Sequence, residues 1–286
     1  MSVVLPTIGR AELVRACLAS LVLCEPRADE ILVVDSSTDD TVAHIVASFS
    51  HVGAHVIPFE KSGLGHAFNE GLRRAKHETV LLTNDDCIVD PSWVRVGAGL
   101  AVQPDVIVTG RVLPDGDPDV VPSTIVDQLQ HDYQGRSGFF LFTQCMALDR
   151  NSVLEFGAFD GRISPSAEDN DLSYRWLRAG RTIRYEPDFV VWHRDWRSPE
   201  QLERLYIDYG VGQGVVYAKH LLDRDLRIGR FLARDAYAVA RGLVDRVLRG
   251  PRPHGDWRVG LARGLPVGLL KGWRLYSDAR SEDESE

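Results

Sequence analysis

Thr79-Val80-Leu81-Leu82-Thr83-Asn84-Asp85-Asp86 is an apolar run that ends in an amide and two carboxylates. We interpret the run as a buried strand and Asn84-Asp85-Asp86 as the cluster at its C-terminal end. Open α/β sheets bind ligands beyond this end of their strands. Adjacent carboxylates repel one another, so they need a cation or a proton nearby. A divalent metal that holds a diphosphate would supply the cation.

A second acidic cluster, Glu168-Asp169 with Asp171, lies further along the chain and opens a helix-like stretch. Trp192-His193 follows it after an apolar run. A carboxylate of this second cluster can serve as a base. The two clusters together favour a transferase that acts on a nucleotide-activated donor.

Strand-like and helix-like segments alternate on both sides of the first cluster. Short apolar runs occur at 2–5, 30–34, 54–57, 80–83 and 106–109, and segments of helical periodicity at 11–23, 39–49, 64–76 and 91–102. The repeated order of strand and helix predicts βαβ units, and therefore an α/β fold with a mostly parallel central sheet.

The chain after residue 110 is less regular. We expect a long connection at 110–137 with one helix at 123–133, a strand at 139–148, helices at 151–156 and 168–179, and two short strands at 182–185 and 189–192. From Pro199 the pattern predicts helices to about residue 280, broken near 250–253 and at Pro266. The acidic segment 281–286 is expected to be a disordered tail.

Composition places the chain among ordinary soluble proteins. It has 286 residues, of which 44% are hydrophobic and 26% charged, and a net charge of −8. The charge is uneven, because residues 197–280 hold 16 Lys/Arg against 9 Asp/Glu. Four cysteines without regular spacing indicate reduced thiols. We expect no cleaved signal and no membrane span, so the cytoplasm is the expected location, with peripheral contact at the inner membrane face as an alternative.

Seven segments occur in a characteristic order: VVLPTIGR (3–10), ILVVDSSTDDT (31–41), Asn69 followed by Gly71, VLLTNDDC (80–87), FGAFDGR (156–162), AEDNDLSYRWLRAG (167–180) and VVWH (190–193). In order and spacing they resemble the family-2 glycosyltransferases. The resemblance covers roughly residues 1–195 and implies the GT-A fold, a single nucleotide-binding α/β sheet. We therefore expect a GT-A-like catalytic domain at 1–197 and a helical extension at 198–280.

The resemblance implies a site for a nucleoside-diphosphate sugar. Pro6, Thr7 and Asp35 would lie in the nucleotide pocket, Asp35 near the base or ribose and Asp85 near the ribose. Asn84 and Glu168 would also belong to the sugar-nucleotide site. The alternative for Asp35 is a residue of a turn.

The resemblance also implies a divalent metal, Mn²⁺ or Mg²⁺. Asn84-Asp85-Asp86 occupies the family's D-x-D position, with Asn in place of the first Asp. Asp86 would be a metal ligand and His193 a second one, and diphosphate oxygens would complete the shell. The alternatives are a solvated turn for the cluster and a structural role for the histidine.

Asp169 is the residue that the family uses as general base. It would accept the proton of an acceptor hydroxyl as that oxygen attacks the anomeric carbon, and this single displacement inverts the configuration. The alternative is that acidic residues in a first helical turn simply favour the helix dipole, with Asp171 paired to Arg175. Small molecules, polysaccharides and polyprenyl phosphates remain open as acceptors.

Arginine-rich helices with an apolar stripe follow the catalytic region, and Trp257, Trp273 and Tyr276 are residue types common at membrane interfaces. Two interpretations remain: peripheral contact with a membrane, or packing of these helices on the catalytic domain or in a homodimer. Nucleic acid is not expected as a partner, because the chain is acidic overall and contains no recognisable binding module.

Two rival functions are weighed against the transferase. A nucleotidylyltransferase also joins an α/β sheet to a metal, but usually carries a Gly-rich basic loop after its first strand, and LPTIGR has one Gly and one Arg. A catalytically silent protein that binds sugar nucleotides as a scaffold is the other, and the retained Asp86, Asp169 and His193 argue against it.

Overall fold

The computed structural model describes residues 1–60, 63–100, 103–134, 138–250 and 256–283, except the side chains of 249 and 279–283. The chain forms two compact units. We call the first, Met1–Gly161 with Asp169–Trp196, the sheet unit, and the second, Arg162–Glu168 with the chain from Arg197 onward, the helical unit. The short segment Arg162–Glu168 therefore belongs with residues from which Asp169–Trp196 of the sheet unit separates it in sequence.

Four parallel strands form the N-terminal part of the sheet. Their order is β3 (Ala54–Pro58), β2 (Glu30–Asp35), β1 (Ser2–Thr7) and β4 (Thr79–Leu82). All four coincide closely with predicted strands, which confirms the parallel α/β architecture for this half of the sheet.

The sheet continues with strands of mixed direction. Their order is β8 (Met146–Asp149), β6 (Val106–Asp115), β9 (Thr182–Arg194) and β5 (Cys87–Val89), and β7 (His131–Tyr133) also pairs with β9. β6 and β9 are parallel, whereas β8, β5 and β7 run antiparallel to their neighbours. These strands bring residues far apart in sequence to the edge of the sheet where β4 ends.

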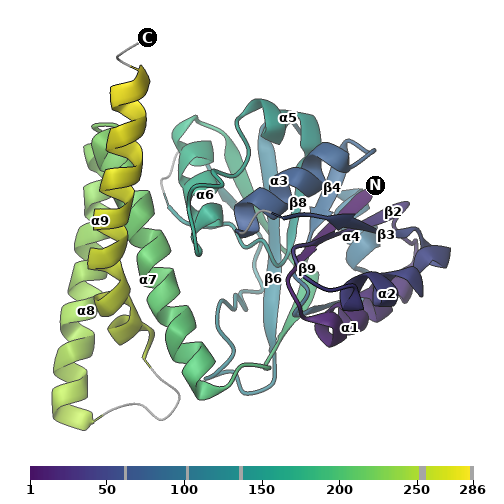
Figure 1. The fold of residues 1–286 in the computed structure, drawn as a ribbon, viewed down its shortest axis with the longest axis horizontal. Helices are drawn as coiled ribbons and strands as arrows, with labels where there is room; N and C mark the ends of the chain where they lie inside the picture. The colour runs from purple at the N-terminus through teal and green to yellow at the C-terminus, as the bar shows by residue number, and fades with distance from the viewer. Residues whose placement is uncertain (61–62, 101–102, 135–137, 251–255, 284–286) are drawn as a thin grey trace. The chain divides into compact units, whose positions relative to one another are not determined.

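Helices cover both faces of the sheet (Figure 1). One face packs against α1 (Ala11–Val22), α2 (Thr41–Ala47) and α4 (Trp93–Gly99), and the other against α3 (Leu64–Arg74), α5 (Arg150–Glu155) and α6 (Glu168–Arg178). Successive strand residues point to opposite faces, so Val3 and Leu5 join the first core and Val4 the second. The strands are apolar at consecutive positions because both faces are buried.

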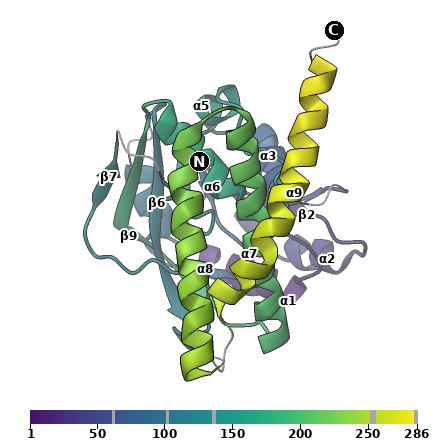
Figure 2. The same cartoon turned by 90° about the vertical axis from the view of Figure 1, so that its left-hand side faces the viewer.

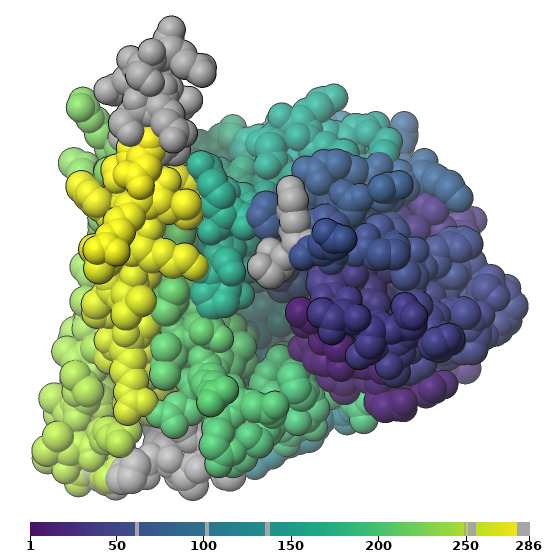
Figure 3. All heavy atoms as spheres, viewed as in Figure 1, coloured from purple at the N-terminus to yellow at the C-terminus, as the bar shows by residue number. Residues whose placement is uncertain are grey.

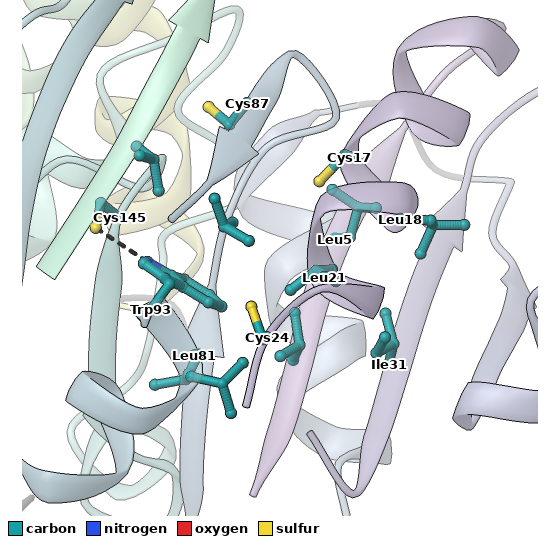
Figure 4. Close-up of a cluster of buried hydrophobic side chains, with 14 of the residues drawn as sticks. Leu5, Cys17, Leu18, Leu21, Cys24, Ile31, Leu81, Cys87, Trp93 and Cys145 are labelled. Carbon is teal, nitrogen blue, oxygen red and sulfur yellow. Dashed lines mark hydrogen bonds between the residues drawn. The ribbon is translucent and has the colours of Figure 1, made fainter. Parts of the chain in front are cut away.

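All four cysteines are free and buried on the α1 face, in the core that Figure 4 shows. The Trp93 indole N–H donates to Cys145 Sγ at 3.3 Å, and this thiol donates to the Phe189 carbonyl at 3.3 Å. Burial raises the pKa of the Cys145 thiol far above its ordinary value. These cysteines therefore serve as core residues, in agreement with the expected reduced thiols.

The helical unit contains α7 (Pro199–Leu222), the short η2 (Leu226–Ile228), α8 (Gly229–Arg249) and α9 (Trp257–Asp283), which Figure 2 shows. Ser198 and Gln201 form a capping box at the start of α7. In the space-filling view the side chains of α9, in yellow, lie directly against those of α7 (Figure 3). No described helix is long and apolar enough to cross a membrane.

Several expected elements differ from the structure. The helix expected at 123–133 is wrong: Ile125 bridges to Val112 and β7 pairs with β9, so strand pairing prevails there. The two strands around Pro187 are one strand, β9, opposite an irregularity at Gly110/Arg111 of β6. The strand expected from residue 139 starts only at Met146.

The C-terminal helices also differ from their expected limits. Pro266 does not break α9, because it lies on the exposed side, where the carbonyl that loses its partner can turn to water. Part of the segment expected to be a tail, 281–283, is the end of α9, and 284–286 lie outside the described residues.

Candidate active site

The acidic cluster Asn84-Asp85-Asp86 follows the end of β4, as expected. The last residue of β4, Leu82, pairs with Met146 at the start of the antiparallel β8. The chain therefore leaves β4 toward the cluster at the same edge where the residues before β8 enter the sheet. This edge is the carboxyl end of the parallel strands, where open α/β sheets bind ligands.

Asp85 is fully buried and held by the first loop of the chain. The Thr7 hydroxyl donates to Asp85 Oδ2 at 2.6 Å, and Arg10 Nε donates to the same oxygen at 2.8 Å. Burial raises the pKa of Asp85 to about 6 even though the Arg10 guanidinium opposes the shift, and the charge of Asp86 raises it further. Asp85 therefore binds a proton more tightly than an exposed aspartate does.

Two oxygens of the cluster have no hydrogen-bond partner among the described residues: Asn84 Oδ1 and Asp85 Oδ1. A buried polar atom without a partner costs free energy, and functional sites are a common reason for one. Both atoms can accept from hydroxyl groups of a ribose or bind a cation. The Asn in place of the first family Asp thus retains an acceptor oxygen.

Asp86 and His193 meet through strand pairing. Cys87 of β5 pairs with His193 of β9, and the Arg194 N–H donates to the Asp86 carbonyl at 2.9 Å. His193 Nε2 lies 3.3 Å from Asp86 Oδ2, and both side chains are buried. The Trp196 indole N–H donates to the same Asp86 oxygen at 3.0 Å.

The imidazole of His193 is held in one orientation by a backbone carbonyl. Its Nδ1 lies 2.8 Å from the Pro122 carbonyl, which can only accept, so Nδ1 carries a hydrogen. Nε2 then faces the Asp86 carboxylate, so a cation placed beside both groups would contact the ring nitrogen and a carboxylate oxygen. Metal-binding histidines are commonly oriented in this way by a backbone carbonyl. The residues present therefore fit a divalent metal.

The protein supplies only part of a metal shell here. Among the described residues no group of three or more His, Cys, Asp and Glu side chains is placed to hold a metal ion. Asp86 offers carboxylate oxygens and His193 a ring nitrogen, which are atom types that Mn²⁺ or Mg²⁺ can bind. Any other ligands would have to come from a bound molecule or from water.

Asp169 lies in the first turn of α6, and its Oδ1 accepts the Asn170 N–H at 2.7 Å. Burial raises the pKa of Asp169 to about 6, although the backbone N–H of Thr143 and nearby amides favour the ion. Thr143 lies three residues before β8, at the same sheet edge as Asn84. A carboxylate with this pKa can gain and lose a proton near neutral pH.

Asp171, two residues after Asp169, is held by an ion pair. Asp171 is fully buried and accepts from Arg175 Nε at 2.7 Å, which confirms the predicted pair. The same guanidinium donates to the Ala158 carbonyl. Glu168, the first residue of α6, is buried as well. Asp171 is therefore a structural residue that fixes α6 against the loop before it.

Pro6, Thr7 and Asp35 lie side by side at the ends of β1 and β2. Thr7 pairs with Asp35 in the parallel ladder. Asp35 Oδ1 accepts from the N–H and the hydroxyl of Ser37, so this carboxylate takes part in the turn that follows β2. The Ser37 hydroxyl accepts the Gly9 N–H at 2.7 Å, which ties the first two loops of the sheet unit together.

Two residues of the site were not predicted, Arg10 and Trp196. The Arg10 guanidinium lies 5.3 Å from the centre of the Trp196 ring, so these side chains stack while each binds one carboxylate of the cluster. The Arg of LPTIGR was a visible signal. The partners lie 75 and 110 positions from the cluster residues, so spacing alone could not pair them.

Similarity to known proteins agrees with this arrangement. The glycosyl transferase family 2 model matches residues 2–156. No curated protein sequence matches the chain. The mannosyltransferase PcManGT from Pyrobaculum calidifontis, in complex with GDP-Man and Mn²⁺, is 20% identical with a TM-score of 0.62, over 98% of this chain and 83% of that one.

Two further solved structures share the fold at lower identity. S. aureus TarS 1–349 in complex with UDP-GlcNAc is 15% identical with a TM-score of 0.57, over 97% of this chain and 91% of that one. GalNAc-T7 with UDP, GalNAc and Mn²⁺ is 15% identical with a TM-score of 0.53, over 97% of this chain and 54% of that one.

The family model covers more than half of the chain, and its match starts in β1 and extends past the acidic cluster. The GT-A fold expected from the sequence is confirmed by these neighbours. The match favours glycosyl transfer over both rival functions. The chain belongs to glycosyl transferase family 2 and is a glycosyltransferase.

Proposed function

We propose that the protein moves a sugar from a nucleoside-diphosphate sugar to an acceptor hydroxyl in one displacement that inverts the anomeric configuration. The observation that carries the proposal is the buried Asp86–His193 pair beside Asp85, which places a carboxylate oxygen and an imidazole nitrogen 3.3 Å apart. Sugar-nucleotide complexes of proteins with the same fold support the choice of donor.

The donor would lie across the ends of β1, β2 and β4. Pro6, Thr7 and Asp35 would contact the nucleoside, and Asn84 and Asp85 would accept from ribose hydroxyls. The acceptor oxygens of Asn84 and Asp85 that lack partners support this assignment. Glu168, at the start of α6, would contact the sugar side of the donor.

Asp86 and His193 would hold Mn²⁺ or Mg²⁺. A bound metal would neutralise the charge that develops on the departing diphosphate. The Trp196 indole N–H and the Pro122 carbonyl would hold the two side chains in place. Arg10 would add a fixed positive charge beside Asp85.

Asp169 would act as general base. Its carboxylate would take the proton of the acceptor hydroxyl while the oxygen bonds to the anomeric carbon and the bond to the diphosphate breaks. The raised pKa supports this role, because a carboxylate with a pKa of about 6 is a stronger base than an ordinary aspartate and is still ionised at neutral pH.

The base is tested with Asp169→Asn. We expect kcat to fall by at least about 10²-fold, with donor affinity within about twofold of the wild type. Asp188→Asn is the matched control, because Asp188 is exposed on β9 and should leave both constants unchanged. Near-normal turnover of Asp169→Asn would remove this residue from the mechanism.

The metal is tested by calorimetry with UDP and GDP, with and without Mn²⁺. We expect Mn²⁺ to tighten binding of the preferred nucleotide, and Asp86→Ala to lose this dependence while still binding the nucleotide weakly. The readout does not depend on turnover. Equal affinity of the wild type with and without metal would contradict the metal assignment.

A further inference from the structure

One side of α8 carries two neighbouring rows of exposed residues. The first row is Ala233, Ala236, Ala240, Leu243 and Val247, and the second is Arg230, Arg234, Tyr237, Arg241, Val244 and Leu248. Residues three and four apart are neighbours on a helix, so these rows form one surface, which we call the α8 face. Val247 is 85% exposed, Leu248 76% and Tyr237 68%.

The opposite side of α8 packs within the helical unit, which leaves the α8 face exposed to solvent. Ile228, Phe231 and Gly242 are buried, and a Cβ on Gly242 would lie 2.7 Å from Arg258 of α9. Packing within the helical unit therefore uses the side of α8 opposite the α8 face. The apolar residues that the sequence places along this helix therefore divide into two groups. Ile228 and Phe231, near its start, are buried, whereas Leu243, Val247 and Leu248, near its end, are exposed.

The charge on the α8 face has one sign. The acidic residues of α8 are Asp235 and Asp245, and both are engaged within the helical unit: the Tyr217 hydroxyl donates to Asp235, and Arg258 pairs with Asp245. The charged groups of the face are the guanidinium groups of Arg230, Arg234 and Arg241. Arg234 is also 3.3 Å from Asp235, at the margin of the face.

The positive charge and the apolar residues together indicate which kind of partner the α8 face can bind. A second copy packed face to face would bring the guanidinium groups of both copies together, which is unfavourable at a buried interface. An anionic phospholipid surface offers phosphates to the arginines and acyl chains to the apolar rows, and a helix with these two features lies in the plane of the membrane interface.

The end of α8 is close to another residue suited to this boundary. Arg258 of α9 contacts Asp245, so the end of α8 and the start of α9 approach each other (Figure 2). Trp257, the first residue of α9, is 47% exposed, and tryptophan is enriched at membrane interfaces.

We propose that the α8 face binds the surface of an anionic phospholipid bilayer. Leu243, Val247 and Leu248 enter the boundary between headgroups and acyl chains, and the arginines bind lipid phosphates. This proposal concerns the helical unit alone and does not depend on the assignment of the catalytic residues.

Flotation with vesicles tests the proposal on the full chain. We expect the wild type to float with vesicles of phosphatidylcholine and phosphatidylglycerol in equal parts, and to float much less with phosphatidylcholine alone or in high salt. The double variant Val247→Glu/Leu248→Glu should lower the bound fraction at least about tenfold. Arg230→Gln/Arg241→Gln should lose the preference for the anionic vesicles.

The control adds the same charges elsewhere. Val126→Glu/Leu129→Glu changes two exposed apolar residues of the sheet unit and should float like the wild type. All variants should keep the circular dichroism and the Tm of the parent. Absent flotation, or equal flotation with both kinds of vesicle, would overturn the proposal. So would a lipid-free dimer, detected by light scattering, that Val247→Glu/Leu248→Glu dissociates.

Discussion

Asp85 and Asp169 are carboxyl groups whose pKa values burial raises to about 6, yet their neighbours differ. Asp85 accepts from the Arg10 guanidinium and the Thr7 hydroxyl, whereas Asp169 accepts from backbone N–H groups. The Arg10 guanidinium and the Thr7 hydroxyl hold Asp85 Oδ2 in place through charge-assisted hydrogen bonds. The two environments therefore fit a binding role for Asp85 and a proton-transfer role for Asp169.

The pH dependence of turnover follows from the raised pKa of Asp169. The base works only when ionised, so we expect kcat to be constant above a pH of about 7 and to fall about tenfold per pH unit below about 6. Measuring kcat at saturating donor and acceptor checks this. A profile that stays flat down to a pH of about 5 would contradict a base with this pKa.

Replacing the Asp169 carboxyl group with an amide should stabilise the folded protein. A folded-state pKa above the unfolded value means that the proton binds more tightly in the folded protein, so the stabilisation that the carboxyl contributes is full at low pH and is lost as pH rises through about 6. At neutral pH the ionised, partly buried Asp169 therefore lowers the free energy of unfolding. We expect Asp169→Asn to raise the free energy of unfolding by about 1–2 kcal/mol at pH 7.5 in urea titrations. A lower Tm than that of the wild type would contradict this account.

Asp171 should behave in the opposite way, although it lies two residues away. Asp171→Asn leaves Arg175 without its buried anion, so we expect the free energy of unfolding to fall by about 1–3 kcal/mol. Turnover of the folded enzyme should remain within about threefold of the wild type. Urea unfolding and kcat, each measured on the same sample, separate the two effects. A loss of kcat as large as that of Asp169→Asn, without loss of stability, would make Asp171 a reacting group.

Local sequence identified the cluster residues and the Asp171–Arg175 pair, because adjacent carboxylates and a spacing of four on a helix are visible without a structure. It did not identify Arg10 and Trp196 as partners of the cluster. Their contacts depend on strand order, since β9 returns beside β5 and carries Trp196 toward Asp86. Such contacts appear only when the sheet is assembled.

At the scale of elements, the parallel strands were predictable because each is an apolar run bounded by helical periodicity. The strands β5 and β7 have three residues each and obtain their conformation from pairing with β9, so no local pattern marks them. The direction of β8 was likewise not predictable from its own residues. Of these strands, β5 directly follows Asp86 and pairs with His193 of β9, so an element that local sequence does not mark positions part of the site.

The contact between α7 and α9 depends on glycines at intervals of four in α9. Gly260, Gly264, Gly268 and Gly272 all face α7, and a Cβ on Gly264 would lie 2.1 Å from the Ile207 carbonyl oxygen. The two backbones approach too closely for a side chain, as in the small-residue packing known between membrane helices.

Gly264→Ala should therefore destabilise the helical unit. We expect the free energy of unfolding to fall by about 1–3 kcal/mol, because the backbone of α7 must move. Gly229→Ala, on α8, is the matched control: no atom lies within 4 Å of its added Cβ, so it should be neutral or stabilise by up to about 1 kcal/mol. Urea unfolding of the two variants checks the difference. Equal stability would mean that α7 and α9 are not so closely packed.

At the scale of the whole molecule, the C-terminal helices contact the segment that precedes the proposed base in the chain. The segment Arg162–Glu168 belongs to the helical unit, and the next residue in the chain is Asp169. Ile163 and Ala167 pack with Val215 and Val216 of α7. Lys271 donates to the Ser164 carbonyl at 2.8 Å, and the Arg162 guanidinium lies 4.4 Å from the centre of the Tyr276 ring. The helical unit thus holds the segment that leads into the proposed base.

Gly212→Ala tests this connection. Gly212 of α7 lies so close to the segment that an added Cβ would be 2.1 Å from the Ser166 carbonyl oxygen, so the segment must shift. Because a displacement of about 1 Å at a reacting group can cost about 10²-fold in rate, we expect kcat to fall at least about tenfold. Calorimetric affinity for the nucleotide should stay within about twofold of the wild type, since Thr7, Asp85 and Asp86 belong to the sheet unit. Gly229→Ala serves as control and should leave both quantities unchanged. A folded Gly212→Ala protein with normal kcat would show that the helical unit does not position Asp169, whereas parallel losses of kcat and nucleotide affinity would indicate damage to the sheet unit instead.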